Sequence, residues 1–150
     1  MLAFLLIALL AAVILFAVIA RPHPRSRATA RRSGGFGSTP RLDRAAMQDR
    51  WATIQAMAAG GGNGLRQAVS EADKLLDLAL RQTGASGDTM GDRLKSARPR
   101  FADYAAYDGA WRAHKLRNAL AHEVGFDLVP SQAREALSDF ERALRAIGGL

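Results

Sequence analysis

The pattern of apolar and polar positions divides the chain into three parts. Residues 1–20 are all apolar and contain neither glycine nor proline. Residues 21–41 show no periodicity, and arginine, serine, glycine and proline predominate in them. From residue 42 onward, apolar residues recur at the three- and four-residue spacing of amphipathic helices. The pattern therefore predicts an apolar helix at 1–20, a disordered linker at 21–41 and a soluble helical domain at 42–150.

The domain is expected to contain four to five helices. Breaks at the glycine-rich run 60–64, at the loop 84–88 and at Pro99 separate the periodic segments. Asp88 or Thr89 can cap a short third helix. No segment alternates with a period of two, so a sheet is not expected. The expected helices cover residues 42–59, 65–84, 89–97, 100–123 and 130–147, with Gly109 as a candidate kink in the fourth. The fold class is thus all-α: a single N-terminal transmembrane helix followed by a four- to five-helix bundle.

Residues 2–20 are long enough to cross a bilayer. A helix of these 19 uncharged residues measures about 28 Å, close to the thickness of the hydrocarbon core. A cleaved signal peptide is the alternative, with Ala20 at the cleavage site, but no basic residue precedes the apolar run. The arginines that follow indicate a cytoplasmic C-terminal side. We therefore expect a single-pass protein of the cell membrane with its C-terminal domain in the cytoplasm.

The charged residues are distributed unevenly between the three parts of the chain. The chain has a net charge of +7, yet residues 21–41 hold six arginines and no acid. From residue 42 onward there are 15 basic and 14 acidic residues, so the domain itself is almost neutral. The linker arginines are expected to bind anionic lipid headgroups, with an RNA-binding arm as the alternative. Membrane lipid, contacted by residues 2–20 and by these arginines, is the first expected partner.

Cysteine and histidine usage excludes several kinds of site. The chain has no cysteine, which excludes disulfides and thiol catalysis. Its three histidines have no matching set of carboxylates, so neither a metal site nor a cofactor is expected. The glycine-rich stretch 84–94 lacks the lysine of a phosphate-binding loop, and a tight turn between helices is the better interpretation.

The fourth expected helix carries the candidate chemistry. On a helical projection, His114, Asn118 and His122 fall within about 80° of arc, with Trp111 and Tyr107 on the same side. Tyr104 extends this stripe. The opposite arc is apolar and is expected to face the core; it holds Ala113, Leu116, Leu120 and Val124. A helix with two such faces is either central in its bundle or packed against a second copy in a homodimer.

At residues 117–122, with the sequence RNALAH, the chain resembles HEPN domains through their R-x4-H motif. The resemblance implies an all-α bundle, often homodimeric, that binds RNA or nucleotides or cleaves RNA without a metal. It further implies that Arg117 holds the scissile phosphate, that His122 is the general acid and base, and that Asn118 orients it. Arginine and histidine suit these roles chemically.

Other residues of this helix are expected to bind the substrate. They are His114, Lys115, Trp111 and Tyr107. Arginine and lysine interleave with the aromatic residues, as in single-stranded RNA binders.

Structural roles remain open for each of these residues. Asn118 and His122 can simply share an i, i+4 hydrogen bond, and Arg117 can pair with Glu123 or Asp127. The aromatic residues can serve in packing, and His114 and Lys115 can be solvated. The sequence thus leaves two functions: a membrane-anchored, HEPN-like endoribonuclease or nucleotide- or RNA-binding dimer, or a non-catalytic, membrane-tethered scaffold for an unidentified protein partner.

Overall fold

The computed structural model describes residues 42–150, which form helices joined by short connections. The all-α prediction is confirmed for this part of the chain, in which no strand occurs. The elements are α2 (Arg44–Ala59), α3 (Gly62–Gln82), α4 (Met90–Ser96), the 3₁₀ turn η1 (Arg98–Arg100), α5 (Tyr104–His122) and α6 (Pro130–Ala146).

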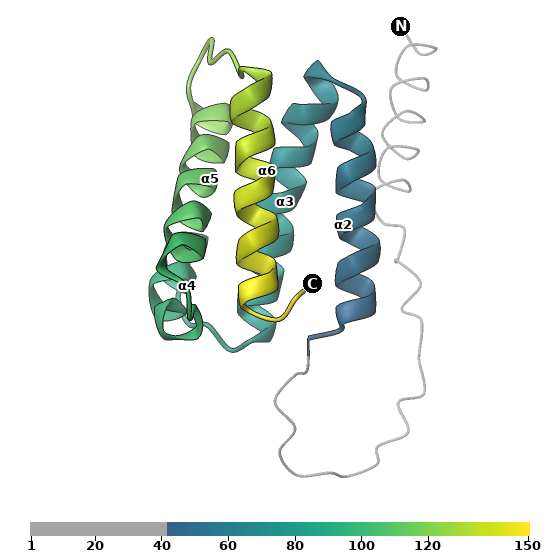
Figure 1. Cartoon of the computed structure of the whole chain (residues 1–150). Helices are drawn as coiled ribbons and strands as arrows, with labels where there is room; N and C mark the ends of the chain where they lie inside the picture. The colour runs from purple at the N-terminus through teal and green to yellow at the C-terminus, as the bar shows by residue number, and fades with distance from the viewer. Residues whose placement is uncertain (1–41) are drawn as a thin grey trace, which may run out of the picture. The chain divides into compact units, whose positions relative to one another are not determined.

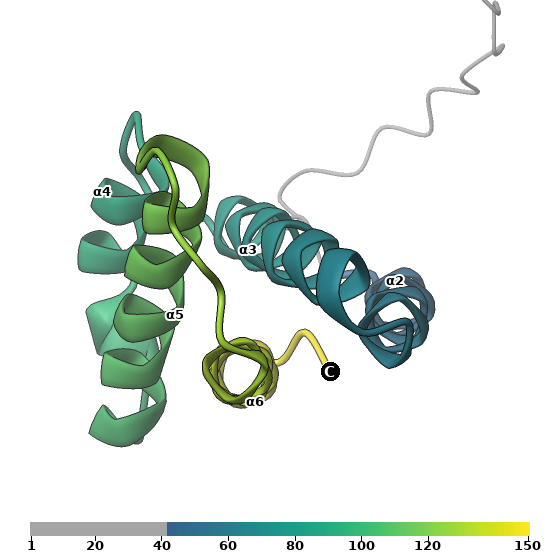
Figure 2. The same cartoon turned by 90° about the horizontal axis from the view of Figure 1, so that it is seen from above.

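The four long helices run alternately up and down (Figure 1). Seen from above, α4 and α5 lie on one side, α2 lies on the other, and α3 and α6 lie between them (Figure 2). The helix α3 contacts α2, α4, α5 and α6, whereas α2 packs chiefly on α3. The helix α3 is therefore the centre of the bundle.

The apolar stripes of α3 and α6 account for this arrangement. In α3, Leu65, Val69 and Leu76 are buried at helical spacing, and in α6 Phe140 and Leu144 are buried in the same way. Burying one such side chain contributes about 1.5–3 kcal/mol. Buried residues from all five α-helices pack together in one cluster, so residues 42–150 have a hydrophobic core of their own.

Small residues form the core face of α5. Its buried residues are Ala106, Gly109, Ala110 and Ala113. Leu116 and Leu120 are only partly buried, although they pack against the core. The prediction that Val124 faces the core is wrong: its side chain is fully exposed. The helix ends at His122, and Glu123 takes an extended conformation, so helical spacing no longer applies to Val124.

Two predicted helix starts are also wrong. The glycine-rich run does not separate α2 from α3 over its whole length, because α3 begins at Gly62 and only Gly61 has a positive φ, of 74°. A Cβ atom on Gly64 would lie 2.2 Å from the carbonyl oxygen of Met57, which explains the need for glycine there. The fourth expected helix, α5, begins at Tyr104 rather than at residue 100, because Asp103 accepts the backbone N–H of Ala105 as an N-cap.

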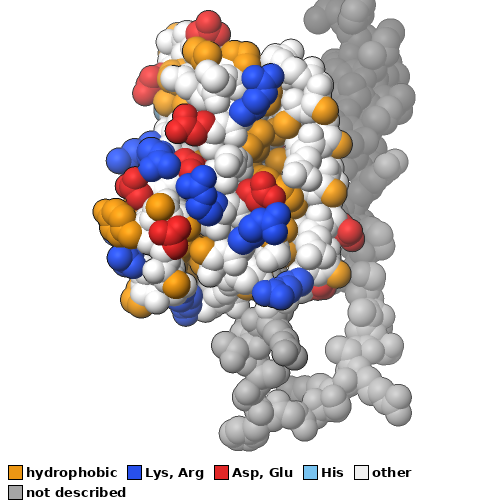
Figure 3. Space-filling view, in the orientation of Figure 1, with side chains coloured by type: hydrophobic (Ala, Val, Ile, Leu, Met, Phe, Trp, Pro, Cys, Tyr) orange, Lys and Arg blue, Asp and Glu red, His pale blue; other side chains and the backbone are white. Residues whose placement is uncertain are grey.

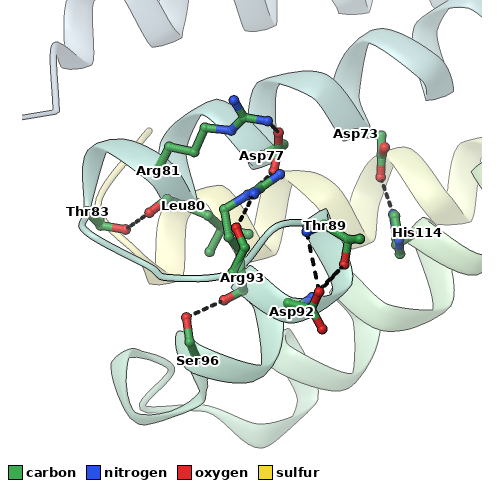
Figure 4. Close-up of polar contacts among 11 residues, drawn as sticks. Asp73, Asp77, Leu80, Arg81, Thr83, Thr89, Asp92, Arg93, Ser96 and His114 are labelled. Atoms are coloured by element: carbon green, nitrogen blue, oxygen red, sulfur yellow. Dashed lines mark hydrogen bonds and ion pairs between the residues drawn. The ribbon is translucent and has the colours of Figure 1, made fainter.

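The short helix α4 begins as predicted at a threonine cap. The hydroxyl of Thr89 accepts the backbone N–H of Asp92, and the carboxylate of Asp92 accepts the N–H and the hydroxyl of Thr89 (Figure 4). The two hydrogen bonds from Thr89 lower the pKa of Asp92 below its ordinary value. This capping box fixes the start of α4, which covers α5.

The predicted membrane helix at 2–20 and the linker at 21–41 lie outside the described residues. Among the helices of residues 42–150, none combines the length and the apolar character that a bilayer crossing requires.

Candidate functional site

All seven candidate residues lie on α5, but only some of them meet. His114, Arg117 and Asn118 come together beside α3. His122 is the last residue of α5 and is exposed, as is Lys115. Trp111 and Tyr107 are half-buried on the side of α5 that faces α4 and η1. The contacts found for Arg117 and Asn118 among the described residues thus do not include His122.

A buried carboxylate on α3 holds His114 in place. Asp73 is 5% exposed, and its Oδ1 lies 2.7 Å from Nδ1 of His114 (Figure 4). The side chain of His114 is itself only 12% exposed. A carboxylate on one ring nitrogen fixes the orientation of an imidazole, as in sites where histidine acts as an acid or a base.

Two further residues close a ring of polar contacts. Nε2 of His114 lies 3.2 Å from Nδ2 of Asn118, and Nη1 of Arg117 donates to Oδ1 of Asn118 at 3.2 Å. Nε of Arg117 lies 3.4 Å from Oδ2 of Asp73. Asp73, His114, Asn118 and Arg117 thus form one closed circuit, here called the Asp73 ring.

The Asp73 ring fixes the position of the imidazole proton. A guanidinium can only donate hydrogen bonds, so the amide oxygen of Asn118 faces Arg117 and the amide nitrogen faces His114. Nε2 of His114 must then accept from this nitrogen. The proton of a neutral His114 therefore resides on Nδ1, which donates it to Asp73.

The Asp73 ring borders a pocket of about 440 Å³ between α3, α4 and α5. Its lining consists of Asp73, Lys74, Asp77, Thr89, Met90, Gly91, Arg93, His114, Arg117 and Asn118. Within this lining, Arg93 is already engaged: it donates to Asp77 at 2.6 Å and to the carbonyl of Gly87 at 2.6 Å. Arg117 is 28% exposed, and no contact is found for its Nη2 among the described residues. Arg117 is thus the cation of the Asp73 ring with donor capacity left for a ligand.

The aromatic stripe of α5 packs within the chain. The rings of Tyr107 and Trp111 meet edge to face at 6.5 Å, and Trp111 meets His114 in the same way at 6.1 Å. The guanidinium of Arg98, in η1, lies over the rings of Tyr104 and Tyr107 at 5.2 and 5.1 Å. The segment of α4 and η1 therefore covers this side of α5, and the aromatic stripe has its neighbours within its own bundle.

The simpler contacts considered from the sequence are not those in the structure. Asn118 bonds to His114, four residues before it, rather than to His122. Arg117 pairs with Asp73 rather than with Glu123 or Asp127. Within residues 42–150, no three metal-ligating side chains gather.

Asp73 is the residue that sequence reasoning missed. A signal for it was present, since Asp73 follows Val69 by four residues and precedes Leu76 by three on the buried side of α3. A charged residue at the edge of an apolar stripe must be paired when it is buried. Its partner, however, lies 41 residues further along the chain, and spacing cannot indicate such a pairing.

A second buried carboxylate lies on the other side of α5. Asp139 of α6 is 3% exposed, and Nη2 of Arg112 donates to its two oxygens at 3.1 and 3.0 Å. Arg142 lies 3.5 Å away. The carboxylate of Asp139 raises the pKa of Arg112 above its ordinary value. Asp139 also sits directly against Gly109, where a Cβ atom would lie 2.6 Å from Oδ1.

Comparison with known proteins adds no relative to this picture. No family model, curated protein or solved structure matches the chain. The resemblance to HEPN domains therefore rests on residues 117–122 alone.

Proposed function

We propose that residues 42–150 bind a phosphate group of RNA or of a nucleotide in the pocket beside the Asp73 ring, and that the domain cleaves RNA without a metal. The observation that carries this proposal is the convergence of His114, Arg117 and Asn118 on one pocket. Two of these three residues belong to the HEPN-like motif. With residues 2–20 as an anchor, the domain would act at the cytoplasmic face of a membrane.

Arg117 is suited to the phosphate. Asp73 and Asn118 take two of its nitrogens, and Nη2 remains for an anionic oxygen. The contact with Asp73 also holds the guanidinium in place before a ligand arrives, which lowers the ordering cost of binding.

His114 is better placed than His122 to act as the general base. It lines the pocket, and Asp73 sets its proton on Nδ1. Nε2 can take the proton of a ribose 2′-hydroxyl once the amide of Asn118 moves aside. The 2′ oxygen then bonds to phosphorus, the bond from phosphorus to the 5′ oxygen breaks, and the 5′ oxygen takes a proton from water. This leaves a cyclic phosphate and a 5′-hydroxyl end.

The test uses purified residues 42–150 with varied RNAs and chelator present. We expect cleavage that Arg117→Ala and His114→Gln each reduce by about 100-fold or more, as for loss of a general base. The matched control is His122→Ala, which should keep its activity because His122 is exposed and outside the pocket. Loss of activity in His122→Ala with retention in His114→Gln would return the catalytic role to His122. Wild-type protein that neither cleaves nor binds RNA contradicts the proposal.

A second function is favoured by the closure of the Asp73 ring. Every member already has a partner within the chain, which also suits a purely structural link between α3 and α5. In that case the domain is a non-catalytic, membrane-tethered interaction module. Arg117→Ala would then lower the free energy of unfolding, and neither the wild-type protein nor the variant would bind RNA.

A further inference from the structure

The side of the bundle away from the Asp73 ring carries an open groove between α2 and α6, here called the α2–α6 groove. It has a volume of about 240 Å³ and is lined by Trp51, Ile54, Gln55, Ala58, Arg134, Leu137, Ser138 and Glu141. Hydrophobic side chains gather in this strip between the two helices (Figure 3). The same two helices are also joined by Arg44 at the start of α2, which donates to the carbonyl of Gly148 after α6 at 2.9 Å.

Two polar groups of the α2–α6 groove lack a partner among the described residues. Trp51 is 94% buried in its wall, yet its indole N–H finds no acceptor among the described residues. Arg134 is exposed and makes no ion pair within residues 42–150. A buried donor without an acceptor is unfavourable, so the wall of the groove keeps an unsatisfied polar atom.

The charges along the groove are arranged for a second copy of the same chain. Arg134 and Glu141 are seven residues apart on α6, so they project from the same side of the helix, with Leu137 and Ser138 between them. Two antiparallel copies of α6, related by a twofold axis between Leu137 and Ser138, bring each Arg134 opposite Glu141 of the second copy. Glu141 gives one oxygen, Oε1, to its own Arg145 and keeps the other free for this contact.

We propose that the chain forms a twofold-symmetric homodimer through the α2–α6 groove. The apolar lining around Leu137 packs against its own copy, and two Arg134–Glu141 pairs set the register. The pocket beside the Asp73 ring is lined by residues of α3, α4 and α5. The helices α4 and α5 lie on the opposite side of the bundle from α2 (Figure 2), so the proposed dimer leaves both pockets open. This inference is independent of RNA binding.

The test uses cross-linking of the full chain in membranes. Since the chain has no cysteine, Ser138→Cys introduces a unique thiol beside the proposed axis. We expect oxidation to give a covalent dimer. The matched control is Ser131→Cys, also exposed on α6, whose two copies would lie about 20 Å apart along the helices. Equal cross-linking at both positions would overturn the proposed register.

A charge swap tests the pairing itself. In the Ser138→Cys background, Arg134→Glu and Glu141→Arg should each reduce the cross-linked fraction about tenfold, since each sets two pairs of like charges together. The double variant should restore cross-linking. Light scattering on residues 42–150 should rank the dimer fractions of these variants in the same order. Thermal melts confirm that each variant is folded. A double variant as weak as the single ones, or a wild-type protein that stays monomeric at high micromolar concentration, would overturn the proposal.

Discussion

Two buried carboxylates flank α5, and the chain neutralises them differently. Asp139 is held by the arginines Arg112 and Arg142, packs directly on Gly109 and borders a hollow of only about 150 Å³. Asp73 is held by one arginine and one histidine and borders a pocket of about 440 Å³. An arginine pair keeps its charges at all ordinary pH values, whereas a histidine can exchange a proton.

The difference separates a packing role from a chemical one. At Asp139, the charges are permanent and the backbone of α5 lies against the carboxylate, so the contact fixes how α5 and α6 approach each other. At Asp73, the partner can carry a proton to and from a pocket. Burial of an acidic residue alone therefore does not indicate a functional site; the partner and the adjoining space do.

The largest loss of stability is expected from adding one carbon atom at Gly109. The new Cβ atom would lie 2.6 Å from Oδ1 and 2.9 Å from Cγ of Asp139, so α5 and α6 must shift apart. We expect Gly109→Ala to lower the free energy of unfolding by about 1–3 kcal/mol in urea titrations, despite the better helix propensity of alanine. Gly62→Ala is the control, because no atom lies within 4 Å of its added Cβ. Equal stability of both variants would mean that Asp139 is not a close-packed contact.

Asp73→Asn and Asp139→Asn sharpen the comparison further. Each removes the charge of a buried carboxylate and keeps its shape, so we expect each to cost about 1–3 kcal/mol of stability. Only Asp73→Asn should weaken RNA binding or cleavage. Asp49→Asn, at an exposed position of α2, should change stability by less than about 0.5 kcal/mol. A loss of RNA binding in Asp139→Asn as large as in Asp73→Asn would remove the distinction between the two sites.

Thr89, the cap of α4, lines the pocket beside the Asp73 ring, and the stability that this cap contributes should depend on pH. Because the pKa of Asp92 is lowered in the folded state, its contribution is complete above the ordinary carboxylate pKa of about 4 and is lost as the pH falls through the folded value. We expect Thr89→Ala to cost about 1 kcal/mol at pH 7, and this deficit to shrink in acid. Urea titrations of both proteins across this range measure it. A deficit that stays constant down to pH 2 would show that Asp92 does not take part in the cap.

The smallest effect involves one proton and no change in stability. The Asp73 ring requires that neutral His114 carry its hydrogen on Nδ1. Nitrogen chemical shifts of the histidine rings, followed as the pH is raised, should show this tautomer for the neutral form of His114. In Asn118→Ala the constraint on Nε2 is gone, and His122 serves as an exposed reference. A hydrogen found on Nε2 of His114 would contradict the proposed direction of the hydrogen bonds.

The sequence was sufficient to predict those helices, and those helix ends, that depend on residues close together in the chain. The start of α6 at Pro130 was predicted correctly, and Thr89 was one of the two caps expected for α4, because both features depend on local residues. The start of α3 was missed, since the close approach of the Met57 carbonyl to Gly64, which leaves no room for a Cβ atom, depends on how α2 and α3 pack.

The candidate site was predictable only in part. Its position on α5 came from the local sequence, but the pairing of His114 with Asp73 depends on how α3 and α5 pack. Because α5 ends at His122, Val124 does not continue the apolar face of the helix and is exposed.

The hydrogen bond from Arg44 to Gly148 joins the first turn of α2 to the segment after α6. The bundle therefore begins and ends at the same point of its surface, as Figure 1 shows for α2 and the C-terminus. Such a bundle can be rearranged by circular permutation. A short linker from Leu150 to Leu42, with new ends opened in the exposed loop after His122, should leave every core contact intact.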